Sequence, residues 1–538
     1  MRRFLLLLLV AAPALAQDVE FTSSNLPIVL IDTDGAEIPD EPKITARMRI
    51  VDNGPGQRNA VTDPPNDYDG WIGIEVRGSS SQRFPKKQYG IETRTEGGED
   101  LDVSLLGFPE EEDWVLYAPY SDKTLMRNVL AYGLARRMGR YASRTRFCEV
   151  VLNGRYQGVY VFMEKIKRDD VRVDINKLKE DEVEGDDLTG GYIFSLDKTT
   201  ERSPAIGWTS PFPPPAPTGL PVFYQFEVPD ADDIVPQQAA YIEGFMTAFE
   251  TAMASDQFED PEVGYPAFID LGSFVDFFIV TEVGRNVDGY RLSSFFHKDK
   301  DSNDPRLHAG PVWDFNLAFG NADYYDGHRN TGLQVDFALP YEYPVPFWWP
   351  KLSESAGFRA ALRARWDELR TGPLHTDSLM AEIDATVALL DEAQARNFER
   401  WPIHGVYVWP NAHIGESYAD DVGFLKAWLG NRMGWLDGEV RREIVAVEPG
   451  VDAGFALSAP RPNPSGDRAR LTLALDGPQN VTVDVFDVRG RRVARLWDGP
   501  LADGAELAVD TAALPAGVYL VRAVGAVASA SRRLVVVR

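Results

Sequence analysis

The chain is poor in cysteine and histidine. Its 538 residues contain one cysteine, Cys148, and six scattered histidines. A single cysteine excludes an intrachain disulfide. Cys148 lies in an apolar, strand-like run over residues 146–151, which favours an inert core thiol over a nucleophile. A zinc site built from the histidines would need partners that are distant in the sequence.

Basic charge and long hydrophobic runs are also scarce. The 55 Lys and Arg residues are outnumbered by 82 Asp and Glu residues, and the net charge is −27. Such an acidic surface repels phosphate backbones, so we expect no nucleic-acid partner. No segment after the amino terminus approaches the ~20 apolar residues of a membrane-spanning helix. We therefore expect a soluble mature protein with no transmembrane segment.

The common catalytic signatures are absent as well. The sequence contains no His-Glu-x-x-His, Gly-x-Ser-x-Gly or Gly-x-Gly-x-x-Gly motif and no P-loop. These absences exclude the enzyme classes that depend on those motifs.

The first sixteen residues are typical of a cleavable signal peptide. Arg2 and Arg3 precede an apolar run over residues 4–10, and Ala14-Leu15-Ala16 follows it. We expect cleavage after Ala16, because a small-residue motif of this kind ends a signal peptide. A buried amino-terminal helix is the alternative. The sequence thus predicts export from the cytoplasm.

Strand and helix patterns alternate through most of the chain. Apolar periodicity predicts strands over 71–77, 87–93, 290–297 and 307–313, and helices over 124–138, 271–282 and much of 358–441. Asn153-Gly154 joins two apolar runs and predicts a hairpin, since both residues tolerate positive φ. The proline-rich stretch 203–221 predicts a loop or flap.

The composition changes near Val447. Beyond it, short alternating strands separated by glycine and proline turns predict a β-sandwich of roughly ninety residues. A chain of this length is too long for one core. We expect a signal peptide over 1–16, a main domain over 18–446 and a sandwich over 452–538.

Four motifs of the sandwich occur in a characteristic order, and the chain from 462 onward resembles the C-terminal sorting domain of type IX secretion. The resemblance implies transport across an outer membrane by the type IX machinery, then release or surface attachment. An immunoglobulin-like spacer is the alternative. The motifs are Pro462-Asn463-Pro464, the run over 485–493, Leu514 to Tyr519, and Arg532 to Val537.

Polar motifs follow the apolar elements of the main domain, and together they resemble the CotH kinase family over most of residues 70–400. The family resemblance implies an α+β atypical protein-kinase-like domain, here followed by a small all-β sandwich. It also implies that ATP and Mg²⁺ or Mn²⁺ serve to phosphorylate Ser or Thr of an exported protein substrate. The motifs are Arg77 to Ser81, Phe84 to Tyr89, Asp122 to Thr124 with Arg127-Asn128, Glu164-Lys165, Arg285 to Asp288, and Trp313 to Gly320.

The same resemblance assigns roles to individual residues. Asp288, which follows Asn286, takes the place of the catalytic carboxylate, and Asn286 joins the cofactor site. Asp314 and Asn316 take the place of the metal ligands, although the family often has a second Asp where this chain has Asn316. Asn is still an oxygen ligand but carries no charge.

The remaining assigned residues would hold the nucleotide. Lys86 or Lys87 would contact phosphate, and one of them would pair with Glu164 as the kinase strand lysine pairs with a helix glutamate. Arg77 and Arg127 would grip phosphate or carboxylate. Ser79 to Ser81 would supply backbone amides.

Two other functions remain open from the sequence. The chain is either a kinase or a catalytically inactive surface binding or structural protein that keeps the fold. A glycan-binding module is a third reading, because aromatic side chains stack on sugars. Core packing explains the same aromatics, which are Phe347-Trp348-Trp349, Trp401 and Trp409.

Overall fold

The computed structural model divides the chain into two compact units, Met1–Arg442 and Glu443–Arg538. The predicted signal peptide, apart from Ala16, and the predicted boundary between 446 and 452 lie outside the described residues, so both stay predictions. The structure describes residues 16–199, 203–214, 220–336, 343–442, 455–458, 460–475, 477–487, 491–525 and 529–537.

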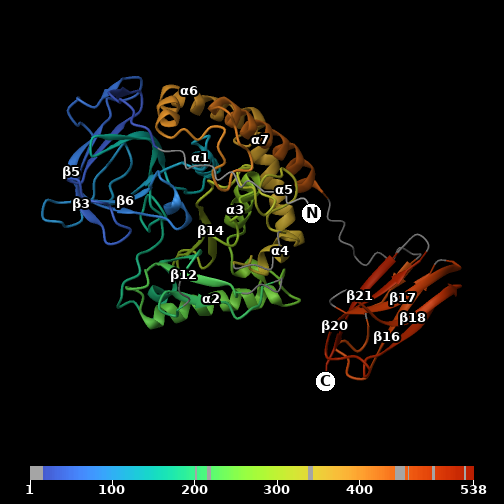
Figure 1. The fold of residues 1–538 in the computed structure, drawn as a ribbon. Coiled ribbons are helices and arrows are strands. Elements are labelled where there is room, and N and C mark those ends of the chain that lie inside the picture. The colour runs from blue at the N-terminus through green and yellow to red at the C-terminus, as the bar shows by residue number, and fades with distance from the viewer. Residues whose placement is uncertain are drawn as a thin grey trace, which may run out of the picture. The chain divides into compact units, whose positions relative to one another are not determined.

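The large unit begins with a closed β-barrel (Figure 1). Neighbouring strands are antiparallel except β2 and β8, which run parallel. Ile72, Ile74 and Ile91 point into the barrel and are fully buried, as the predicted strands require. The strands follow the order β2 (Ile28–Asp32), β3 (Ile44–Val51), β5 (Tyr68–Val76), β6 (Tyr89–Arg94), β7 (Asp113–Tyr117), β9 (Arg155–Glu164) and β8 (Thr145–Leu152).

The hairpin that links β8 and β9 is confirmed. Asn153 and Gly154 have φ angles of 50° and 72°, the left-handed values that this turn requires. Cys148 lies in β8 and is fully buried, and burial raises the pKa of its thiol. The prediction of an inert core thiol is therefore confirmed. A short pair, β1 (Ser23–Ser24) with β4 (Asn59–Ala60), lies outside the barrel.

A second sheet and a buried helix follow the barrel. The sheet has the order β11 (Gly207–Thr209), β12 (Phe223–Val228), β10 (Tyr192–Leu196), β13 (Ser294–Lys298), β14 (Leu307–Val312). Helix α3 (Leu271–Gly284) packs against β14 and is buried almost throughout, as its apolar sequence predicts. The short 3₁₀ helices are η1 (Ser80–Arg83), η2 (Asp186–Thr189) and η3 (Tyr265–Ala267).

Three predicted boundaries are wrong in this region. The strand predicted from residue 290 begins only at Ser294, because Tyr290 and Ser293 adopt positive φ angles of 69° and 48°. The proline-rich stretch contains β11, which pairs with β12, and its residues 215–219 lie outside the described ones. Helix α1 (Arg127–Arg137) starts three residues late, after Leu125 at a φ of 64°.

Helices cover the second sheet and one side of the barrel (Figure 1). Helix α6 packs against β9 and α7, whereas α5 packs against α3 and α7. The predicted helical region 358–441 is confirmed except for residues 371–375 and 401–417, which lie between the helices. The helices are α2 (Pro236–Ala254), α4 (Trp348–Ser353), α5 (Ala356–Arg370), α6 (Thr376–Arg400) and α7 (Tyr418–Arg441).

The C-terminal unit consists of two antiparallel sheets, as predicted for a small sandwich. In β16, Ala469, Leu471 and Leu473 are buried and alternate with exposed residues, so one face of the strand lies in the core. One sheet has the order β15 (Phe455–Leu457), β16 (Arg468–Leu475), β19 (Gly504–Asp510), and the other β18 (Arg492–Leu501), β17 (Gln479–Asp487), β20 (Gly517–Val524), β21 (Ser529–Val536).

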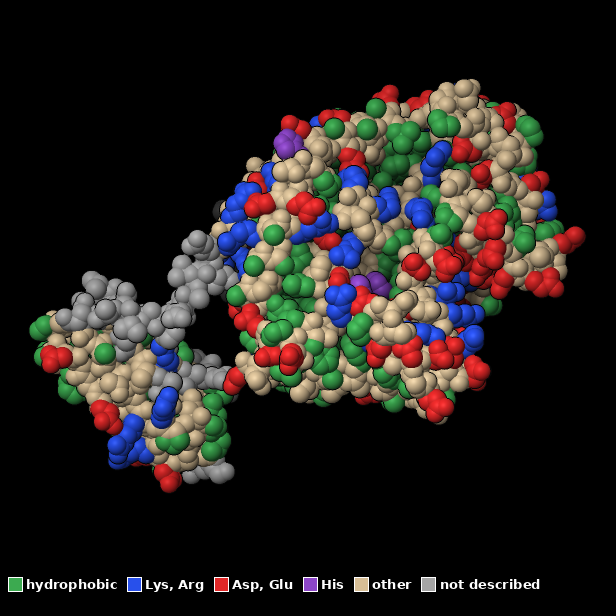
Figure 2. Space-filling view, turned by 180° about the vertical axis from the view of Figure 1, so that it is seen from behind, with side chains coloured by type: hydrophobic (Ala, Val, Ile, Leu, Met, Phe, Trp, Pro, Cys, Tyr) green, Lys and Arg blue, Asp and Glu red, His purple; other side chains and the backbone are tan. Residues whose placement is uncertain are grey.

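Acidic and basic side chains are interspersed over the face of the large unit seen in Figure 2. The excess negative charge therefore does not form one uniform patch on that face. None of the described helices is long and apolar enough to cross a membrane.

Candidate functional site

A cleft of about 240 Å³ lies where the barrel meets the second sheet and the loop after β14. The barrel contributes the segment Arg77–Ser81, and the second sheet contributes Asp197 and Lys198 at the end of β10. Asp288 follows α3, and Asp314 with Asn316 follows β14. The cleft therefore collects charged side chains from segments that are far apart in the sequence.

Asp314 is held in an unusual backbone conformation at this site. Its φ angle is 56°, a left-handed value that few residues other than glycine adopt. Its backbone N–H donates to the hydroxyl of Tyr132 at 3.0 Å, and its carbonyl accepts from Asn286 Nδ2 at 3.2 Å. Helix α1 and the loop after α3 thus fix the strained residue, as occurs at functional sites.

The carboxyl group of Asp314 has a pKa raised to about 7, first by burial and then by the negative charges of Asp288 and Asp197. Lys198 and Arg77 act in the opposite direction. Three carboxylates around one small space repel one another, so a cation between them is stabilised.

Asp288 is buried and is positioned by its neighbours. Its backbone N–H donates to Asn286 Oδ1 at 3.3 Å, and its carboxylate accepts from Arg291 Nη2 at 2.7 Å. Asn286 therefore contacts both Asp288 and the backbone of Asp314. Asn286 thus fixes the position of Asp288 relative to Asp314.

Asn316 supplies an oxygen that lacks a partner. Its Oδ1 atom is buried and accepts no hydrogen bond from the described residues. Leaving such an atom unsatisfied costs about 1–3 kcal/mol. A hard divalent cation would satisfy it, since Mg²⁺ takes oxygen ligands and is bound by one or two protein groups together with phosphate and water. The donor set of Asp314 and Asn316 fits such an ion.

Two cationic side chains face the same cleft. The guanidinium of Arg77 lies 5.7 Å from the centre of the Trp313 ring and has no hydrogen-bond partner among the described residues. Burial lowers its pKa. Lys198 is exposed and likewise lines the cleft. Both cations can meet an anionic ligand without breaking an existing ion pair.

The serines after Arg77 lie at the rim of the cleft. Gly78 has a φ angle of 98°, and a side chain at its position would collide with Ser81 and Gln88. Gln88 Nε2 donates to Ser81 Oγ at 2.5 Å, which fixes the turn. Only glycine fits at position 78, and the turn that it begins brings Ser79 to Ser81 to the cleft.

Lys86 and Lys87 do not line this cleft, contrary to their predicted contact with phosphate. The Nζ of Lys86 donates to Val159 O at 2.5 Å and to Asn397 Oδ1 at 2.8 Å, and burial lowers its pKa to about 7. Lys87 donates to Gln82 O at 2.5 Å. Both lysines precede β6, which begins at Tyr89, two residues later than the predicted strand.

Glu164 and Arg127 both form ion pairs inside the large unit; the partner of Glu164 differs from the prediction, whereas Arg127 holds a carboxylate, one of its two predicted partners. Glu164 is buried and accepts from Arg144 at 2.5 Å, with Arg172 at 3.6 Å, so its predicted pair with Lys86 or Lys87 is wrong. Arg127 forms a buried ion pair with Asp122 at 2.5 Å and donates to Ala318 O at 3.1 Å. Both residues stabilise the walls around the cleft.

Asp197 and Lys198 also line the cleft, and no sequence motif pointed to them. Burial raises the pKa of Asp197, and Ser293 Oγ donates to its carboxylate at 3.3 Å. Both residues directly follow the apolar run of β10, as Asp314 follows β14 after one residue. Their place at the end of an apolar strand is thus the sequence signal by which Asp197 and Lys198 could have been predicted.

The aromatic residues considered for glycan binding are mostly core residues. Trp348, Trp349 and Trp401 are at most 3% exposed, which confirms the packing explanation for these three. Trp409 is 44% exposed, stacks on Tyr324 and lines the cleft. The sequence alone did not separate it from the buried tryptophans.

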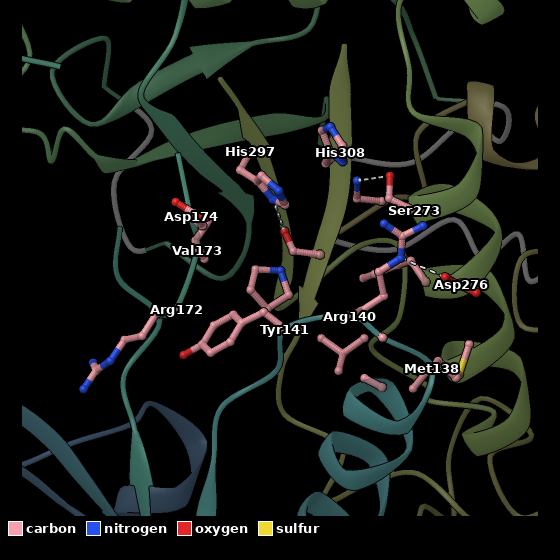
Figure 3. Close-up of a pocket in the computed structure, with 18 residues that line it drawn as sticks. Met138, Arg140, Tyr141, Arg172, Val173, Asp174, Ser273, Asp276, His297 and His308 are labelled. Atoms are coloured by element: carbon pink, nitrogen blue, oxygen red, sulfur yellow. Dashed lines mark hydrogen bonds and ion pairs between the residues drawn. The ribbon is translucent and has the colours of Figure 1, made fainter. Parts of the chain in front are cut away.

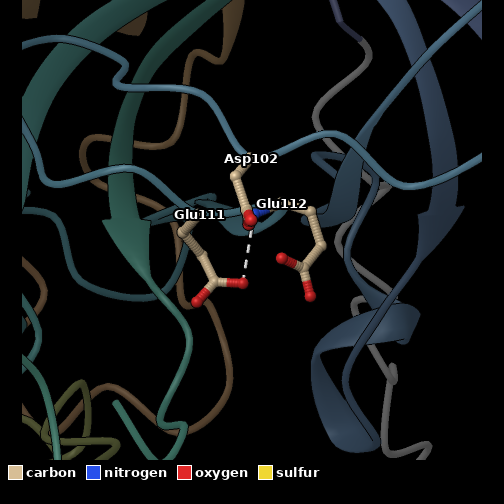
Figure 4. A group of neighbouring side chains, drawn as sticks. All are labelled: Asp102, Glu111 and Glu112. Atoms are coloured by element: carbon tan, nitrogen blue, oxygen red, sulfur yellow. Dashed lines mark hydrogen bonds between the residues drawn. The ribbon is translucent and has the colours of Figure 1, made fainter. Parts of the chain in front are cut away.

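One group of three acidic residues in the described part of the chain has oxygen atoms within 4.8 Å of one another: Asp102, Glu111 and Glu112 (Figure 4). It lies away from the cleft, and Lys167 contacts Glu111 at 2.7 Å and Glu112 at 2.5 Å. Lys167 thus pairs with two of the three carboxylates, so the group has a structural explanation.

The fold and the cleft define an α+β protein with a charged site beside a β-barrel, followed by a separate β-sandwich. In comparisons with known families, the description "CotH kinase protein" matches residues 74–436 and "Secretion system C-terminal sorting domain" matches residues 462–537. The chain belongs to the CotH kinase family, since that match covers more than half of it. A comparison with curated proteins finds no match.

Both predicted resemblances are therefore confirmed. The sorting domain indicates that the protein is exported by type IX secretion and is either secreted or held at the cell surface. Membership of a kinase family suggests ATP and a divalent cation as cofactors.

Proposed function

We propose that the chain is an exported atypical protein kinase that transfers the γ-phosphate of ATP to Ser or Thr of secreted or surface proteins. The observation that carries this proposal is the meeting of Asp288, Asp314 and Asn316 with Arg77 and Lys198 in one cleft. Phosphoryl transfer needs carboxylates, a divalent cation and further cations around the phosphates. The cleft supplies the protein part of that set.

The roles divide between the two sides of the cleft. Asp314 and the unpartnered Oδ1 of Asn316 would hold Mg²⁺ or Mn²⁺, which neutralises charge on the transferred phosphate. Arg77 and Lys198 would contact phosphate oxygens, and the backbone of Ser79 to Ser81 would close over them.

Asp288 would orient the hydroxyl group of the substrate and accept its proton. Its ion pair with Arg291 and its backbone hydrogen bond to Asn286 fix the position of the carboxylate. Transfer then depends mainly on positioning and on electrostatic stabilisation, as in other phosphoryl transfers.

We further propose that the large unit is a divergent kinase-like fold. In support, a β-rich part is followed by a mainly helical part, and the charged cleft lies where the barrel meets the second sheet and the loop after β14. The domain limits 18–446 and 452–538 are part of the same proposal.

A direct test is incorporation of labelled phosphate from ATP by the full chain with Mg²⁺ or Mn²⁺ and a mixture of exported proteins. We expect incorporation that falls at least about a hundredfold in Asp288→Asn and Asp314→Asn, as for other charged transition-state contacts. Asp69→Asn is the matched control, since Asp69 is exposed and pairs only with Arg47 in the described structure.

The alternative, a catalytically inactive surface protein, predicts a different pattern. Wild type and both cleft variants would then give the same background, and ATP with Mg²⁺ would not raise the melting temperature of any of them. That combined result would overturn the kinase proposal.

A further inference from the structure

A second cavity of about 230 Å³ lies beside β14, and no described residue lines both it and the cleft. Its walls come from the end of α1, the segments around Tyr141 and Val173, helix α3, and strands β13 and β14 (Figure 3). The kinase proposal assigns no role to this cavity.

The walls of the cavity are mainly apolar. Met138, Phe277, Val280 and Val312 are buried and line it. Protein interiors leave few voids of this size, and an apolar cavity of roughly 150 Å³ is known to bind benzene. A space of about 230 Å³ therefore has room for a fused two-ring molecule.

One polar atom on the wall has an unused hydrogen-bonding capacity. His297 Nδ1 lies 3.1 Å from the carbonyl oxygen of Gly310 (Figure 3), and because a carbonyl only accepts, Nδ1 carries the proton. Burial, and then the neighbouring His308, lower the pKa of His297 to about 4, so the ring is neutral at physiological pH. Its Nε2 is then a hydrogen-bond acceptor with no partner in the described part of the chain.

The charged residues around the cavity are paired with each other. Arg140 contacts Asp276 at 2.8 Å, and Arg365 contacts the same carboxylate at 2.8 Å. His308, which stacks on His297 at 5.1 Å, lies 3.1 Å from Asp304.

Arg172 adds no free positive charge to the cavity. It pairs with Glu111 at 3.4 Å, and its guanidinium points away from the other lining residues in Figure 3. Asp174, at the edge, is exposed. An anionic ligand therefore finds no free cation here, and a neutral ligand is favoured.

We propose that this cavity is a binding site for a small, flat, neutral molecule that is mainly apolar and carries one N–H or O–H donor. The rings fill the space between Met138, Phe277 and Val312, and the donor bonds to Nε2 of His297. The proposal does not depend on kinase activity.

The test uses two probes of the same size with the full chain. Indole has an N–H donor, whereas benzofuran has an oxygen in its place and cannot donate. Isothermal titration should show saturable binding of indole at one site, about tenfold tighter than benzofuran, since one hydrogen bond contributes about that factor. Equal affinities, or no saturable binding of indole, would overturn the proposal.

A substitution of His297 tests whether the donor of the ligand bonds to this residue. His297→Phe keeps a ring of similar size but has no acceptor, so indole and benzofuran should bind it equally. His375→Phe is the matched control, because this histidine is exposed at the start of α6 and should keep the preference for indole. A preference that persists in a folded His297→Phe chain would also contradict the proposal, and the melting temperature shows whether that chain is folded.

Discussion

At the scale of single residues, the charge of the Asp314 carboxyl group depends on what occupies the cleft. Its ordinary pKa is 3.8 and its pKa in the folded chain is about 7. The neutral form is therefore favoured by folding, and this stability is present in full below about pH 4 and is lost as the pH rises through about 7. A cation bound at the carboxylate favours the charged form and so lowers the pKa of Asp314.

Cation binding should consequently depend on pH. A divalent ion must displace the proton of Asp314, so we expect the apparent affinity for Mn²⁺ with ATP to rise about tenfold between about pH 6 and about pH 8. Calorimetry at the two pH values measures this rise.

Asp314→Asn is the comparison for that measurement. The variant has no proton to displace, so its weaker binding should change little over the same range. A wild-type affinity that stays constant with pH would show that Asp314 does not contact the ion.

Local sequence predicted some residues of the cleft and not others, for physical reasons. Asp288, Asp314 and Asn316 follow buried elements, and the family resemblance singled them out among the polar residues at such points. Lys86 lies before β6 begins and donates to Asn397 Oδ1 instead of lining the cleft. Its partner, Asn397, is separated from it by 311 residues, and no local pattern contains such a contact.

At the scale of elements, a glycine in a turn and a glycine in a helix have opposite effects on the free energy of unfolding. Gly154 closes the hairpin of β8 and β9 at a φ of 72°, whereas Gly434 is exposed inside α7. A Cβ atom at either position would meet no atom within 4 Å. Backbone conformation alone therefore decides the effect of alanine.

The two alanine substitutions should change the free energy of unfolding in opposite directions. Gly154→Ala should destabilise by about 1–2 kcal/mol, because alanine is strained in the left-handed conformation. Gly434→Ala should stabilise by up to about 1 kcal/mol through helix propensity. Urea unfolding of the large unit measures both, and changes of the same sign would contradict the turn geometry.

Most elements of the large unit could be predicted, but their ends could not. Helix α3 and the β8–β9 hairpin carry strong local signals, namely a continuous apolar helix and the Asn153-Gly154 turn. The early part of the strand predicted from residue 290 has an apolar pattern too, yet Tyr290 turns inward to contact Glu282 at 3.0 Å. That tertiary contact outweighs the local preference for an extended chain.

At the scale of the whole molecule, the sorting domain and the family domain lie in separate compact units. A sorting domain is read by the secretion machinery as an address, and the chemistry of the cleft has no part in that reading. Export and nucleotide binding should therefore be separable by mutation.

Removal of the C-terminal unit should abolish transport across the outer membrane and leave the cleft intact. We expect a chain that ends at Arg442 to be absent from the medium and from the cell surface, as measured by fractionation and by protease accessibility of intact cells. The full-length Asp288→Asn chain is the control and should be exported normally. Surface display of the shortened chain would show that the address lies elsewhere.

The burial of Cys148 has a practical consequence for measuring this protein. Its thiol is fully buried inside the barrel and its pKa is raised, so maleimide dyes should not modify it in the folded chain. A cysteine introduced at an exposed position in each unit would then carry a fluorophore while the native residue stays in place. Energy transfer between two such dyes would report the distance between the units during secretion.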